Sequence, residues 1–113
     1  MPSTNLIFII PVSTGLIFII SGFIMLIFPP QKINNLYGYR SPSSKRNQET
    51  WDFAQKYSSK ELIKLGGLLA LSGLLGFIYH PVRDTAMIIG LALVILTVII
   101  LIIRVESAIK KNL

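Results

Sequence analysis

The stretch LIFIIPVSTGLIFIISGFIMLIF, residues 6–28, decides the fold class, because it carries no charged residue along its whole length. An α-helix of this length spans about 34 Å, which matches the hydrocarbon core of a bilayer. Two further apolar blocks follow at residues 62–79 and 86–103, and each is long enough for about 27 Å of helix. A chain of 113 residues is too small to bury three such blocks against one another in water. We therefore predict an all-α integral membrane protein with three transmembrane helices.

The first block must be distinguished from a cleaved signal peptide. Residues 1–5 contain no Lys or Arg, and no small-x-small cleavage site follows in LIFPPQKINN at 26–35. The apolar run is also longer than the usual apolar region of a signal peptide. We therefore expect a retained span. The chain has no cysteine, which excludes disulfides and thiolate metal sites.

The positive charges are distributed unevenly around the three blocks. None precedes the first block, only Arg83 separates the second from the third, and residues 104–113 form a basic tail. The segment between the first two blocks, together with the start of the second, carries Lys32, Arg40, Lys45, Arg46, Lys56, Lys60 and Lys64. The positive-inside rule then places the N-terminus outside and both the long loop and the tail in the cytoplasm. This topology accounts for the net charge of +6, so we expect no nucleic-acid partner.

Small residues recur at four-residue spacing in the second and third blocks, a pattern that lets helices approach closely. The pairs are Gly66/Ala70, Ser72/Gly76 and Ala86/Gly90. They are consistent with packing inside one bundle or with a homo-oligomer, and the pattern does not separate these two alternatives.

Residues 29–61 form a polar segment between the first two blocks. Taken as a helix, residues 44–58 place charged side chains on one stripe and less polar ones opposite. The charged stripe is Lys45, Glu49, Asp52 and Lys56, and the opposite face is Asn47, Trp51, Ala54 and Ser58. We therefore predict an amphipathic helix on the cytoplasmic membrane surface. The capping box SSKE at 58–61 then predicts a new helix start for the second span.

An amide on the inward face of this helix needs hydrogen-bond partners, because an unpaired buried amide costs a few kcal/mol. Asn47 lies on that face, and its expected partners are Asn34, Asn35 and the backbone of the Gly-Tyr-Arg turn earlier in the loop. We predict that Asn34, Arg40 and Asn47 form a hydrogen-bonding centre with Tyr39 and Trp51 as its walls.

The Gly-Tyr-Arg turn sets the geometry of this segment. Gly38 permits a positive φ, and Ser43 or Ser44 is a candidate N-cap for the following helix. Arg40 has no acidic residue nearby in sequence, so its guanidinium is expected to bind either helix C-terminal carbonyls or an anionic ligand. The first alternative makes the segment structural, and the second makes it a pocket for a lipid headgroup, a peptide or another ligand.

The loop pattern N-x-x-x-G-Y-R-[ST]-P-x-S-x-x-N-x-x-x-W-x-x-A resembles the motif of the SdpI family, bacterial plasma-membrane proteins named for immunity to a secreted sporulation-delaying toxin peptide. The matching residues are Asn34, Gly38, Tyr39, Arg40, Ser41, Pro42, Ser44, Asn47, Trp51 and Ala54. The family often has threonine where Ser41 stands. The founding protein also has extra N-terminal spans, so we expect a short form that holds only the family's core unit.

The resemblance implies a membrane protein that binds or counteracts a membrane-active toxin peptide. The partners that the resemblance implies are the toxin peptide and a cytoplasmic regulator. The basic loop separately predicts anionic membrane lipids as partners, and the small-residue pairs allow a second copy of the chain. The candidate ligand-binding or structural residues are Asn34, Gly38, Tyr39, Arg40, Ser41, Ser44, Asn47 and Trp51.

Two other membrane functions are alternatives. A small oligomeric transporter or channel subunit is disfavoured because the three blocks contain no Asp, Glu, His or Arg. A scaffold that binds anionic lipid by charge alone is the other. We expect no enzyme, cofactor or metal site, because His80 is the only histidine and lies in the opposite loop.

Overall fold

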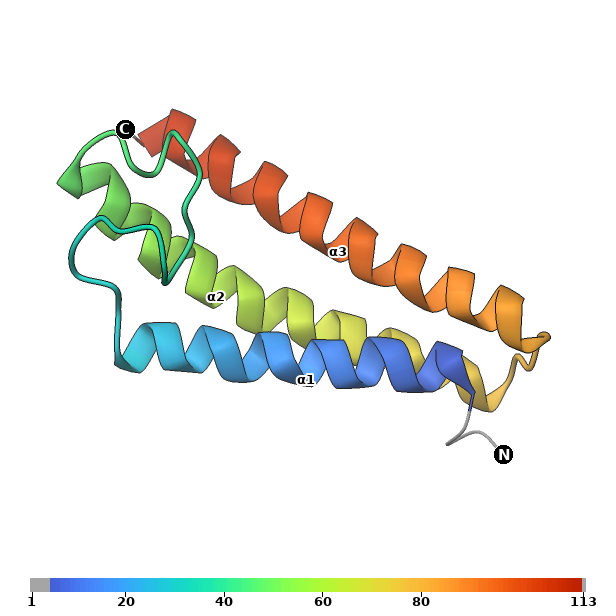
Figure 1. Cartoon of the computed structure of the whole chain (residues 1–113). Coiled ribbons are helices and arrows are strands. Elements are labelled where there is room, and N and C mark those ends of the chain that lie inside the picture. Colours follow the sequence, from blue (N-terminus) through green and yellow to red (C-terminus); the bar gives the residue numbers. More distant parts are fainter. Residues whose placement is uncertain (1–4, 113) are drawn as a thin grey trace.

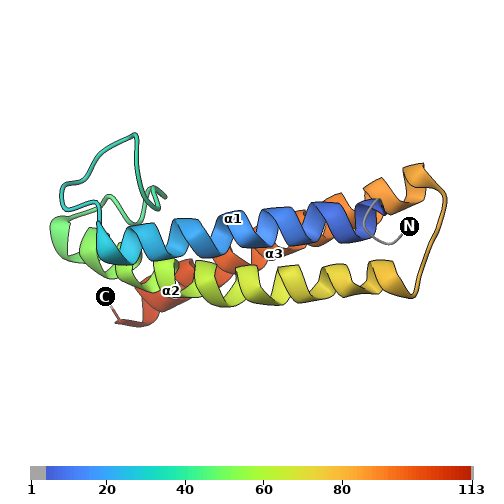
Figure 2. The same ribbon diagram turned by 90° about the horizontal axis from the view of Figure 1, so that it is seen from below.

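The computed structural model describes residues 5–112 as an elongated bundle of α-helices (Figure 1). The helices are α1 (Leu6–Ile27), α2 (Gln48–Ser72) and α3 (Arg83–Asn112), and the 3-10 segment η2 (Gly73–Phe77) continues α2. The part of the chain that the structure describes contains no strand, which confirms the all-α prediction. Turning the bundle by 90° shows the three helices running alongside one another over most of their length (Figure 2).

Two of the helices, α1 and α3, are long and apolar enough to cross a membrane. Most of their large apolar side chains are exposed, as expected of surfaces that face lipid rather than water. The predicted span at 62–79 corresponds to the second half of α2 together with η2, and its insertion remains a prediction. The long axis of the bundle, 49 Å, exceeds a hydrocarbon core of about 30 Å. A polar end of the molecule therefore projects beyond the apolar region.

The contact between α1 and α2 is built on glycines. A Cβ atom at Gly15 would lie 2.5 Å from the carbonyl oxygen of Gly66 and 2.8 Å from the backbone nitrogen of Ala70. Gly90 on α3 similarly faces Ile10 of α1. Three of the small residues predicted to mediate helix packing, Gly66, Ala70 and Gly90, therefore contact α1 of the same chain.

The separate interfacial helix predicted at 44–58 is wrong. α2 begins at Gln48 and continues without a break through Ser58, so the predicted helix and the second span form one element. The true N-cap is Asn47, whose side chain accepts a hydrogen bond from the backbone nitrogen of Thr50 at 2.8 Å. Ser58 and Ser59 do not cap a new helix, because their hydroxyls donate to the carbonyl oxygen of Gln55 in the preceding turn. Serines bonded in this way are compatible with a helix interior.

The boundary of the third helix also differs from the prediction. The apolar block ends at Ile103, but α3 continues through the residues expected to form a tail and reaches Asn112. Its last turns are ordered by burial, since Val105 and Ile109 pack with Ala54 of α2 in one hydrophobic cluster. This contact brings the end of α3 against the start of α2.

Candidate functional site at the loop end of the bundle

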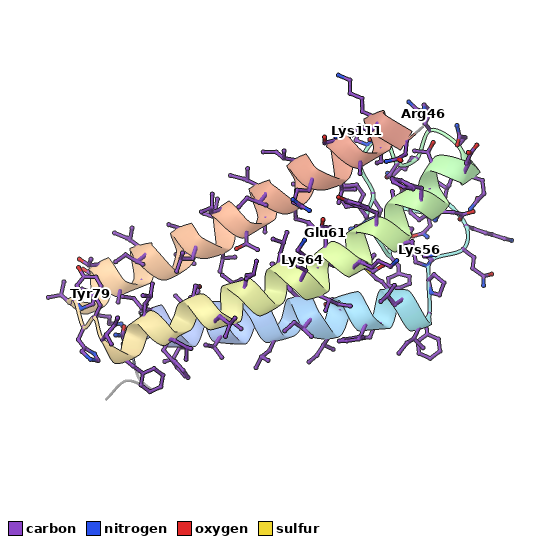
Figure 3. The ribbon with its side chains drawn as sticks, turned by 180° about the vertical axis from the view of Figure 1, so that it is seen from behind. Arg46, Lys56, Glu61, Lys64, Tyr79 and Lys111 are labelled. Atoms are coloured by element: carbon purple, nitrogen blue, oxygen red, sulfur yellow. The ribbon has the colours of Figure 1, made fainter. Side chains whose placement is uncertain are left out.

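Three segments meet at one end of the bundle: the loop 28–47, the start of α2 and the end of α3 (Figure 1). The side-chain view places the basic residues Arg46, Lys56 and Lys111 at this end and Tyr79 at the opposite end (Figure 3). The loop therefore covers the polar end of the helices, where the sequence predicts a functional segment.

Glu106 on α3 is the hydrogen-bonding centre of this end. Its Oε2 atom accepts from the hydroxyls of Tyr39 at 2.6 Å and Ser41 at 2.7 Å, and its Oε1 atom accepts from the hydroxyl of Ser43. We call Tyr39, Ser41, Ser43 and Glu106 the Glu106 cluster. Because three loop hydroxyls converge on one carboxylate, the loop is fixed to a helix more than 60 residues away in sequence.

The Glu106 cluster changes the acidity of two of its members, both of which lie outside the apolar blocks. Burial alone would raise the pKa of Glu106, but the hydrogen bonds from Ser43, Tyr39 and Ser41 outweigh it and lower the pKa below its ordinary value of about 4.5. Burial, followed by the hydrogen bond to Glu106, raises the pKa of Tyr39 well above its ordinary value. At neutral pH the cluster therefore holds one ionised carboxylate and a neutral phenol.

We expect the stability of the protein to fall in acid because of Glu106. A carboxyl whose pKa is lower in the folded state stabilises the fold fully above its ordinary pKa, and this contribution is lost as the pH falls through the lower folded value. Thermal unfolding in detergent, followed by circular dichroism from pH 7 downward, should therefore show a loss that begins near pH 4.5. Glu106→Gln should reduce this loss of thermal stability in acid, whereas Glu49→Gln, at an exposed position, should retain it. Equal losses of stability in the two variants would contradict the role of Glu106.

Gln55 of α2 fixes the Gly-Tyr-Arg turn from the other side. Its Oε1 atom accepts from the backbone nitrogen of Tyr39 at 2.7 Å, and its Nε2 atom donates to the backbone oxygen of Tyr39 at 2.6 Å. Gly38 has a φ of 99°, and a Cβ there would collide with the Gln55 amide. The predicted positive φ is thus confirmed, and close approach gives a second reason for glycine at this position.

Trp51 anchors the loop to α2. Its side chain is fully buried, and its Nε1 atom donates to the backbone oxygen of Pro30 at 2.6 Å. The indole thus packs inside the bundle end, where it is a core residue as well as a wall of the polar segment.

The predicted triad of Asn34, Arg40 and Asn47 is present in this region but does not form one centre. The side chain of Asn34 accepts from the backbone nitrogens of Leu36 and Tyr37, and Arg40 donates to the backbone oxygen of Asn35. Asn47 is exposed at the N-cap of α2, because the helix begins at Gln48 and not at residue 44 as predicted. Each of the three therefore stabilises its own turn. Ser44 is fully buried, and its hydroxyl donates to the backbone oxygen of Ser41 at 2.7 Å.

Sequence reasoning missed Glu106, Gln55 and a second carboxylate, Glu61. Glu61 of α2 is almost fully buried and pairs through Oε1 with Arg104 of α3 at 2.8 Å, while its buried Oε2 accepts no hydrogen bond within the described residues. One signal could have identified Glu106: it is the one acid after the last apolar block, on the side of the membrane where the loop is predicted. In residues 5–112, no group of three or more His, Asp or Glu side chains is placed to bind a metal ion.

Comparison with known proteins identifies relatives of this chain. Residues 31–105 match the SdpI/YfhL protein family. The chain is also 41% identical over 61 residues to a Bacillus subtilis (strain 168) protein named Uncharacterized protein YfhL, and this stretch covers 54% of the chain and 56% of that relative. The match therefore spans little more than half the length of the relative. No solved structure matches the chain.

Proposed function

The chain belongs to the SdpI/YfhL protein family, and from this premise we propose that it protects a bacterial membrane by binding or counteracting a membrane-active toxin peptide. The immunity role comes from the resemblance of the loop motif to SdpI proteins. The proposed binding surface is the cytoplasmic loop end of the bundle, built from the Glu106 cluster and the adjacent Arg40.

One observation supports this assignment most strongly: the loop is fixed at both sides. Glu106 of α3 holds three hydroxyls, and Gln55 of α2 holds both backbone polar groups of Tyr39. A loop that only connected two spans would not need such contacts, because connecting segments tolerate mobility and sequence change. A rigid loop instead presents its exposed side chains in a fixed arrangement, which lowers the entropic cost of binding a partner.

The fixed loop leaves Arg40 exposed at the surface of the molecule. Its Nη1 atom donates to the backbone oxygen of Asn35, and the rest of the planar guanidinium can still donate to a carboxylate or phosphate. We therefore assign Arg40 as the residue of the loop that contacts the ligand, and the Glu106 cluster as the group that positions the loop.

The test is survival of toxin-sensitive bacteria that express the wild type, Arg40→Gln or Lys32→Gln. Lys32 is exposed in the same loop, so the two variants lose the same charge at nearby positions. We expect the wild type and Lys32→Gln to protect equally and Arg40→Gln to lose protection, with equal membrane levels on immunoblots. If both variants protected as well as the wild type, Arg40 would have no role in protection. If the wild type failed to protect, the immunity proposal would be contradicted.

A further inference from the structure

Two cations of the loop, Arg40 and Lys45, converge on one neutral residue. The Nη1 atom of Arg40 donates to the backbone oxygen of Asn35, and the Nζ atom of Lys45 donates to its side-chain Oδ1 at 2.7 Å. Neither contact supplies a negative charge. Within residues 5–112 the one ion pair joins Arg104 and Glu61, so Arg40 and Lys45 have no acidic partner in the fold.

Glu106, the carboxylate that holds the loop, binds other groups of the loop and not these two cations. Glu106 accepts hydrogen bonds from three hydroxyl groups, and those donors use both of its oxygens. Two like charges held near each other repel, and a bound anion offsets this repulsion by attracting both. The loop therefore brings two cations together, and residues 5–112 supply no neutralising anion for them.

The space next to these cations has two chemically different sides. It is an open groove of about 550 Å³ lined by Asn35, Gly38, Tyr39, Arg40, Lys45, Leu101 and Ile102. Leu101 and Ile102 directly precede Ile103, the last residue of the block predicted to lie in the membrane. An occupant would thus meet cations and an amide at the loop and aliphatic side chains on the α3 side.

We propose that this groove binds an anionic phospholipid, with Arg40 and Lys45 on the phosphate and an acyl chain along Leu101 and Ile102. A phosphate suits the pair, because guanidinium and ammonium groups both form charge-assisted hydrogen bonds with its oxygens. The aliphatic side of the groove favours a lipid over a free anion, since only a lipid carries an apolar chain on the membrane side. The inference extends the proposed function by naming a ligand class for the same end of the molecule, and it does not require that the protein confer immunity.

The test is native mass spectrometry of the purified full chain in neutral detergent, titrated with phosphatidylglycerol or with phosphatidylcholine. The site variant is Arg40→Gln/Lys45→Gln. The control is Lys32→Gln/Arg46→Gln, which removes the same charge from exposed positions of the same loop. We expect the site variant to weaken phosphatidylglycerol binding about a hundredfold, because each charge-assisted hydrogen bond to the phosphate contributes about tenfold. The control should stay near the wild-type value, and phosphatidylcholine should bind weakly to all three proteins.

Lys45→Gln alone is the second variant, in case the double substitution disturbs the loop. Within the fold it removes only the contact to the Asn35 side chain, and we expect about a tenfold loss of lipid affinity from the one missing phosphate contact. Equal losses in the site and control variants would overturn the site, since bulk charge would explain both. Displacement of the lipid by excess inorganic phosphate would also overturn the proposal, because the groove would then be a general anion site. Lipid retention and cell survival are separate readouts, so failure here leaves the survival test of the proposed function standing.

Discussion

Gly66→Ala is expected to destabilise the bundle by about 3 kcal/mol, the upper end of the usual cost of adding atoms to a close-packed contact. A Cβ at Gly66 would lie 2.8 Å from the carbonyl oxygen of Gly15 and 2.9 Å from the Cβ atom of Phe18. These atoms belong to the backbone or to its first side-chain carbon, so they cannot rotate away. The methyl group fits only if α1 and α2 separate, which weakens the dispersion contacts that hold helices together in lipid.

The adjacent residue provides a matched control for this prediction. A Cβ at Gly67 would meet nothing within 4 Å, so Gly67→Ala adds the same methyl group to the same helix without a clash. Alanine is favoured over glycine in a helix by about 0.5–1 kcal/mol, and Gly67→Ala should therefore be neutral or slightly stabilising. Unfolding of both variants in the same detergent, followed by circular dichroism, measures the difference. Equal stability of the two variants would show that α1 and α2 are not in contact at Gly66.

The sequence predicted the parts of the fold that depend on local composition. The apolar blocks placed α1 and the greater part of α3 correctly, because a long uncharged run needs no knowledge of its neighbours to be recognised. The helix boundaries were wrong where tertiary contacts decide them. The end of α3 is ordered by packing against Ala54 of α2, which no local pattern shows. The start of the second span was wrong for a local reason, because Ser58 looked like a cap and is instead bonded within its own helix.

The sequence predicted which segment forms the candidate site, but it did not predict that Glu106 is the hydrogen-bonding centre. Tyr39, Ser41 and Ser44 lie in the fixed loop as the motif predicts, and Trp51 faces inward as the helical phase predicts. Glu106 was missed because its partners are more than 60 residues away, so the pattern of the loop alone does not show which carboxylate its hydroxyls meet. The position of Glu106, as the one acid after the last apolar block, was the signal that could have identified it. Asn47 was misplaced for a simpler reason: a shift of the helix start turned an inward-facing amide into an exposed N-cap.

Trp51→Ala is expected to have the largest effect of the single truncations at the loop end, about 3–5 kcal/mol. The side chain is fully buried, so its removal leaves a cavity where α2 meets the loop. It also removes the donor that satisfies the backbone oxygen of Pro30 at 2.6 Å, just after the end of α1. One residue therefore contributes both packing and the hydrogen bond that ties α1 to α2 at this end.

Trp51→Phe separates the two contributions. Phenylalanine keeps most of the apolar volume but has no N–H group, so it leaves the Pro30 oxygen without its donor at a cost of about 1–3 kcal/mol. Denaturant titration in detergent should place Trp51→Phe between the wild type and Trp51→Ala. If Trp51 instead served only as an aromatic anchor at the membrane surface, its substitution would change membrane affinity more than stability. A Trp51→Phe variant as stable as the wild type would thus contradict the buried hydrogen bond, and with it the role of Trp51 in holding the loop against α2.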